Sequence, residues 1–150
     1  VTTELGPGGI VLVIDYGHDA AQLYGPRRMA GSLLTYRGHE VADDPFAAVG
    51  HTDITAHVDV TALERAAAEA GLVLIGSTTQ GTFLARLGLG EMLAELGREP
   101  GVEPQAYLDA RAAVARLLDP RHLGGFRVLA WARPSQDGTA PVLPGFDDTP

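Results

Sequence analysis

An uninterrupted apolar run near the N-terminus, followed by a long polar segment, constrains the fold of this chain more than any other feature. The run is Ile10–Asp15, which follows a Pro-Gly-Gly turn. Such a run is typical of a strand covered on both faces, as in a parallel sheet. The polar segment spans residues 16–59 and shows no hydrophobic period, although a short strand is expected at 32–36. Connections of this length are uncommon inside a compact domain and usually carry function.

After this segment the pattern alternates between helices and strands. A helix is expected to begin at Thr61, because Thr61 and Glu64 have the spacing of a capping box, and to end at Gly71. The later elements are a buried strand at 72–76, a helix at 80–96 that Gly88 and Gly90 weaken, a helix from Pro104 to Asp119, and a strand at 126–132. The order strand, loop, helix, strand predicts an α/β sheet with a right-handed crossover.

Composition restricts the classes of function. The chain has 150 residues, enough for one domain, and no cysteine, which excludes disulfides and thiolate chemistry. A net charge of −8 argues against a nucleic-acid-binding surface, because such surfaces need clustered positive charge. No apolar run has the length needed to span a bilayer.

The two ends of the chain differ from its middle. The N-terminal stretch lacks a basic region followed by an apolar one, so it does not resemble a signal peptide, and we expect a cytoplasmic protein. From residue 134 onward Pro, Gly, Asp and Thr dominate. We therefore expect a domain over 1–133 and a disordered tail over 134–150.

Three motifs of weak specificity suggest chemistry that their context does not support. The glycines at 6–9 precede a strand, whereas a cofactor loop follows a strand and opens a helix, so a turn is the better interpretation. His51, Asp53, His57 and Asp59 match no established metal-binding spacing, and we expect no metal. None of the serines lies in a Gly-x-Ser-x-Gly motif.

Two groups of polar residues remain as candidates. Asp15 and Tyr16 lie at the carboxyl end of the first strand, the edge at which open α/β sheets bind ligands. Asp15 could equally be a turn-former. Alternate residues from Asp53 to Asp59 are polar, as on one face of a strand, and could line a site or only stabilise the loop.

Several of these motifs together resemble the MidA-type family of class I S-adenosylmethionine-dependent methyltransferases. Residues 5–15 resemble the Leu-x-Pro-Gly-Gly turn and fifth strand of that class. The more specific matches are Asp15-Tyr-Gly, Gly31–His39, Asp43–Pro45, Gly50–Asp59, Gln80–Leu84 and Leu123–Leu129. The resemblance covers nearly all of 6–133.

The resemblance implies a Rossmann-like sheet of order 3-2-1-4-5-7-6. This chain would supply strands five, six and seven, with a long insertion after strand five. It also implies S-adenosyl-L-methionine as cofactor and a protein arginine as acceptor. The cofactor-binding strand, Gly-rich loop and acidic residue would belong upstream of Val1, so we expect no methylation by this chain alone.

An arginine acceptor must be oriented and deprotonated, which requires carboxylates, other hydrogen-bond acceptors and a base. The candidate substrate-binding residues are Asp15, Tyr16, His39, Asp53, Thr55, His57 and Asp59. A non-catalytic interaction or assembly module is the alternative, because the first strand without its neighbour would present an open edge.

Overall fold

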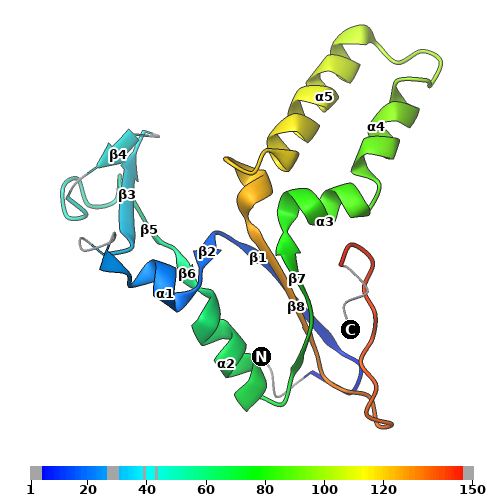
Figure 1. The fold of residues 1–150 in the computed structure, drawn as a ribbon. Coiled ribbons are helices and arrows are strands. Elements are labelled where there is room, and N and C mark those ends of the chain that lie inside the picture. Colours follow the sequence, from blue (N-terminus) through cyan, green and yellow to red (C-terminus); the bar gives the residue numbers. More distant parts are fainter. Residues whose placement is uncertain (1–4, 27–30, 39, 43, 147–150) are drawn as a thin grey trace. The chain divides into compact units, whose positions relative to one another are not determined.

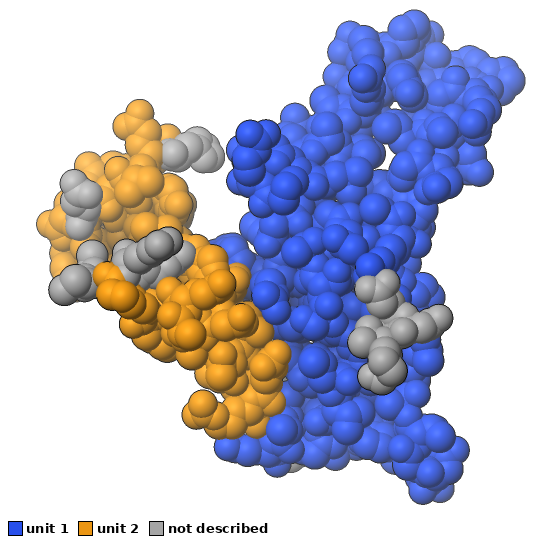
Figure 2. Space-filling model, viewed as in Figure 1, with its two compact units in different colours: residues 1–16, 66–150 blue, residues 17–65 orange. Residues whose placement is uncertain are grey.

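The structure is a computed structural model that describes residues 5–26, 31–38, 40–42 and 44–146 (Figure 1). The chain divides into two compact units (Figure 2). The first unit consists of residues 1–16 and 66–150, and the second of residues 17–65.

The first unit is built on a three-stranded sheet in the order β1-β8-β7. Its strands are β1 (Ile10–Asp15), β7 (Val73–Thr79) and β8 (Arg127–Ala132). Both β1 and β7 run antiparallel to β8, so they are parallel to one another. The middle strand forms the core, because Val128 to Ala132 are all 0–4% exposed.

The two outer strands differ from the prediction. Leu12 and Ile14 on β1 are 46% and 45% exposed, and β7 begins with Val73 and Leu74 at 40% and 48%. Neither strand is therefore buried on both faces within the described residues, and β7 extends to Thr79, three residues beyond the predicted end. The physical reason is their position, since each has one neighbour in this sheet whereas β8 has two.

Helices precede and follow β7. They are α2 (Val60–Glu69), α3 (Gln80–Arg86), α4 (Leu89–Leu96) and α5 (Pro104–Leu118), and a short 3-10 turn, η3 (Leu123–Gly125), leads into β8. The weak point predicted within 80–96 is confirmed, because Gly88 adopts a left-handed conformation with φ 86° and separates α3 from α4. None of the helices in the described residues is long and apolar enough to cross a membrane.

The second unit contains more regular structure than the sequence predicted. A small antiparallel sheet has the order β4-β3-β5, from strands β3 (Leu33–Arg37), β4 (Glu40–Ala42) and β5 (Asp53–Ala56). Strands β2 (Gly17–His18) and β6 (Val58–Asp59) form a parallel pair beside the single turn α1 (Ala20–Leu23). Strands of two to five residues are too short to show a hydrophobic period.

The described part of the expected disordered tail, residues 134–146, makes specific contacts within the first unit. The amide of Ser135 donates to the carbonyl of Thr139 at 2.8 Å. The ring of Phe146 lies 5.0 Å from that of Phe83 and directly over Gly76 on β7. The domain boundary at 133/134 stays a prediction, but the tail covers part of β7.

Gly76→Ala should destabilise the first unit, because a Cβ at Gly76 would overlap the ring of Phe146. We expect a loss of about 1–3 kcal/mol in the free energy of unfolding, measured by urea denaturation. In a Phe146→Ala background the same Gly76→Ala change should be close to neutral. The exposed Phe46→Ala variant is the matched control. Equal costs of Gly76→Ala in both backgrounds would contradict the predicted contact.

Candidate functional site

One polar row crosses the sheet of the first unit where β1 and β7 end. Asp15 ends β1, Thr79 ends β7, and both pair in register with Arg127 at the start of β8. The Asp15 carboxylate accepts from the amide of Tyr16 at 2.8 Å. The ring of Tyr16 lies edge-on to Phe126, with centroids 5.6 Å apart. Because β1 and β7 are parallel, this row occupies their common carboxyl edge, where α/β sheets bind ligands.

Arg127 brings a positive charge to this row. Its Nη2 donates to the hydroxyl of Ser77 at 3.4 Å, a long hydrogen bond. Its Nε is buried and has no hydrogen-bond partner among the described residues. Asp15 and Arg127 are direct neighbours across two strands, yet no ion pair joins them.

An open cleft of about 580 Å³ adjoins this row through Thr79. Its lining consists of Thr79, Gly81, Thr82, Ala85, Arg86, Leu118, Pro120 and Gly124. The Thr79 hydroxyl accepts from the amide of Thr82 at 3.4 Å and so caps α3. The cleft wall thus combines apolar surface and hydroxyl groups with one cation, Arg86, and it contains no carboxylate.

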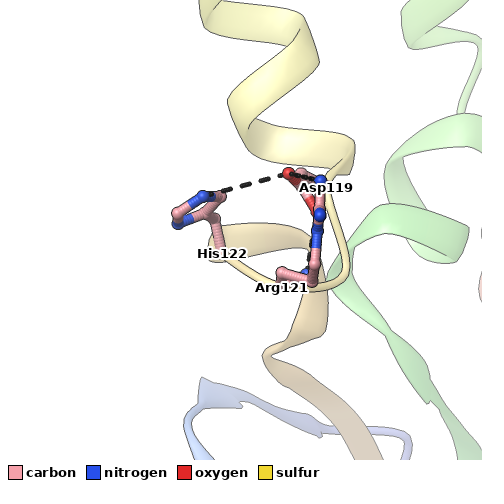
Figure 3. Close-up of polar contacts among 3 residues, drawn as sticks. All are labelled: Asp119, Arg121 and His122. Atoms are coloured by element: carbon pink, nitrogen blue, oxygen red, sulfur yellow. Dashed lines mark hydrogen bonds and ion pairs between the residues drawn. The ribbon is translucent and has the colours of Figure 1, made fainter.

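The turn beside Pro120 carries a cluster of charged side chains (Figure 3). The Asp119 carboxylate accepts from the backbone amide of Arg121 at 2.9 Å and from its Nε at 3.3 Å. The Nε2 of His122 lies 3.9 Å away. These contacts, the backbone hydrogen bond first, hold the pKa of Asp119 below its usual value. Asp119 therefore stabilises the turn between α5 and η3.

In the second unit, two of the sequence candidates, His57 and Asp59, lie at the strand pair β2–β6. The rings of His18 and His57 lie 4.9 Å apart and tilted by 31°. His18 pairs in register with Asp59. The Asp59 carboxylate also accepts a hydrogen bond from Tyr24, which raises the pKa of Tyr24 above its usual value.

The residue that caps α2 is Asp59, so the predicted cap at Thr61 is wrong. The Asp59 Oδ1 accepts from the amide of Ala62 at 3.0 Å, and α2 begins at Val60. The Thr61 hydroxyl instead accepts from the amide of Ala20 at 3.0 Å, at the start of α1. Asp59 thus has a structural function at the start of α2.

The alternating face predicted from Asp53 to Asp59 is not continuous. Asp53 and Thr55 lie on β5, opposite Tyr36 and Leu34. That strand ends at Ala56, and His57 separates it from β6. His39 lies outside the described residues. The described parts of the chain contain no group of three His, Asp or Glu side chains that could hold a metal ion.

Sequence reasoning overlooked Arg127. Of the sequence candidates, Asp15 and Tyr16 lie beside each other in the first unit. His57 and Asp59 lie in the second unit, two positions apart in the chain. A detectable signal for Arg127 was present, since it is the one charged residue in the apolar run 126–132. Its assignment as a substrate contact, like that of the sequence candidates, stays a prediction.

Asp59→Ala should destabilise the second unit by about 1 kcal/mol, because it removes the hydrogen bond that caps α2. Asp59→Asn should keep most of the stability, since asparagine caps equally well. Urea denaturation monitored by circular dichroism measures both, with the exposed Asp53→Ala as control. Equal losses in Asp59→Ala and Asp59→Asn would show that the cap is not the origin of the effect.

Comparison with known proteins gives consistent matches. The family model described as "Putative S-adenosyl-L-methionine-dependent methyltransferase" matches residues 2–78. "Protein arginine methyltransferase NDUFAF7, mitochondrial" from Mus musculus is 32% identical over 117 residues, which are 78% of this chain and 24% of that protein. The protein of that name from Homo sapiens is 31% identical over 123 residues, again 78% and 24%. The chain thus spans about a quarter of the length of these relatives.

Two solved structures from Burkholderia thailandensis share the fold. One, an uncharacterized protein, is 35% identical with a TM-score of 0.80 over 93% of this chain and 36% of its own. The other, a candidate methyl transferase bound to S-adenosyl-homocysteine, is 34% identical with a TM-score of 0.78 over 93% and 35%. The predicted mixed α/β class is confirmed by these likenesses.

The predicted cytoplasmic location is contradicted. The curated relatives from Mus musculus, Danio rerio and Homo sapiens are all named as mitochondrial proteins. Composition gave no basis for distinguishing a compartment.

Proposed function

Since the chain belongs to the family of S-adenosyl-L-methionine-dependent methyltransferases, we propose that it supplies the acceptor side of an enzyme that methylates a protein arginine. The row Asp15–Arg127–Thr79 at the carboxyl edge of the sheet carries this proposal. The acceptor class follows from the relatives, which are named protein arginine methyltransferases.

The sheet order supports the assignment of strands. The sequence resemblance implies that strands five, seven and six end a class I methyltransferase sheet in that spatial order. The observed order is β1-β8-β7, in which the last strand of the chain lies between the other two. With β1 as strand five, residues 17–65 are the insertion that follows it.

The lining of the cleft does not fit a cofactor site. S-adenosylmethionine has ribose hydroxyls, for which nucleotide-binding α/β folds provide a carboxylate, and the cleft lining contains none. The Gly-rich stretch leads into β1 as a turn instead, with the amide of Gly8 donating to Arg133 and that of Arg133 donating to Gly9, each at 2.9 Å. We therefore place the cofactor pocket outside these residues and expect this chain alone to be inactive.

Asp15 is the residue best placed to orient an arginine acceptor. A guanidinium stays protonated in water, so its attacking nitrogen must be aimed, and its proton accepted, by a fixed carboxylate. The amide of Tyr16 holds the Asp15 carboxylate at the strand end. Phe126 holds the Tyr16 ring, which is 38% exposed and offers a surface on which a guanidinium can stack.

The second unit contributes less directly in this proposal. His57 stacks on His18, and Asp59 caps α2, so both have structural contacts. Asp53 and Thr55 on β5 remain proposed substrate contacts, and Asp53 is the more exposed of the two.

The Asp15→Asn variant is tested in a protein that has the full length of the relatives. It should reduce methyl transfer about 100-fold, because an amide neither neutralises the charge of the guanidinium nor accepts its proton. The affinity for S-adenosylmethionine should not change. Radiolabelled methyl transfer and calorimetry measure the two quantities, with exposed Glu95→Gln as control. Undiminished transfer in Asp15→Asn would contradict the proposed role.

A non-catalytic interaction module is the second candidate, and the exposed apolar side chains of β1 favour it. Leu12 and Ile14 are almost half exposed on a strand that has one neighbour in the described sheet. The same full-length protein separates the two functions. Cofactor binding without transfer to any arginine-containing protein would favour the interaction module.

A further inference from the structure

Arg127 is a cation whose hydrogen-bonding capacity is largely unused. Among the described residues its guanidinium makes one hydrogen bond, the 3.4 Å contact with Ser77, although it carries five donors. Its buried Nε lacks a partner in the described structure. Buried donors without partners are rare and costly. A ligand would bind the other guanidinium nitrogens, since the Arg127 side chain as a whole is only partly buried.

Asp15 does not provide that interaction. The two residues are paired across β1 and β8, yet no nitrogen of Arg127 forms an ion pair with the carboxylate. The Asp15 carboxylate is instead bound by the amide of Tyr16. The negative charge of Asp15 and the positive charge of Arg127 therefore lie next to each other on the same edge of the sheet. Each can bind a ligand group of the opposite sign.

We propose that Arg127 is a specificity-determining residue that binds a carboxylate of the acceptor segment beside the side chain that Asp15 holds. The substrate class is then an arginine with an Asp or Glu close to it in the chain. That the segment carries an arginine rests on the proposed function. That it carries a carboxylate rests on Arg127 alone.

The register limits how far apart the two ligand charges can lie. Directly paired residues on neighbouring antiparallel strands have Cα atoms about 5 Å apart. In an extended segment, side chains two residues apart lie on the same face and are separated by about 7 Å. We therefore expect the acidic residue within two positions of the arginine.

Electrostatics favours this edge over the rest of the surface for an acidic segment. The chain carries a net charge of −8, so most of its surface repels carboxylates. Arg127 pairs in register with Thr79, which also lines the cleft. The charge of Arg121 on the nearby turn is already paired with Asp119.

Peptide binding to the complete 150-residue chain tests the proposal. Fluorescence anisotropy would compare two labelled peptides with a central arginine, one with glutamate and the other with glutamine two positions away. The glutamate peptide should bind about tenfold more tightly to the wild-type chain. Equal affinities for the two peptides would overturn the proposal.

Variants assign the preference to Arg127. Arg127→Gln should abolish the discrimination between the two peptides, and Arg127→Lys should keep part of it by retaining the charge. Exposed Arg111→Gln on α5 is the matched control and should keep the full preference. A full preference in Arg127→Gln would overturn the proposal. Thermal melting checks that each variant is folded.

Two further peptides separate this inference from the proposed function. Both have citrulline in place of arginine, which removes the positive charge, and one keeps the glutamate whereas the other has the glutamine. A retained preference for glutamate over glutamine in the citrulline background supports the Arg127 contact even if binding shows no need for arginine. Loss of affinity on changing arginine to citrulline tests the acceptor class separately.

Discussion

The pairing of β8 with both β1 and β7 is the constraint on which the first unit depends. Because β8 has a neighbour on each side, Val128 to Ala132 are 0–4% exposed and form the core. The same register brings Asp15, Arg127 and Thr79 into one row. A shift of one residue would remove Arg127 from its place opposite Asp15 and Thr79, so the register of the core strand also determines the position of the candidate site.

The strongest local patterns predicted their elements, and weak or competing ones did not. Pro104 and the apolar positions after it predicted α5, and Gly88 predicted the break before α4. The cap of α2 was misassigned because Thr61 and Asp59 are both good capping residues two positions apart, and only the structure distinguishes them. The strands of residues 17–65 could not be predicted, since each is too short to show a period.

The candidate site was only partly predictable for a similar reason. Asp15 and Tyr16 follow from the rule that ligands bind at the carboxyl ends of strands, and the structure places them there. Arg127 depends on pairing between strands more than 100 residues apart in the chain, which no local pattern encodes. Asp59 and His57 have types suited to catalysis, but their observed contacts are a helix cap and a stacked imidazole.

The central claim is that this chain carries the acceptor edge of a methyltransferase and that its cofactor pocket lies elsewhere. Isothermal titration of the 150-residue chain with S-adenosylmethionine tests this most directly. The account predicts that binding does not saturate at S-adenosylmethionine concentrations up to about 1 mM. The reason is that the cleft lining provides no carboxylate to hold the ribose. Stoichiometric binding with a dissociation constant of about 1–10 μM would contradict the account.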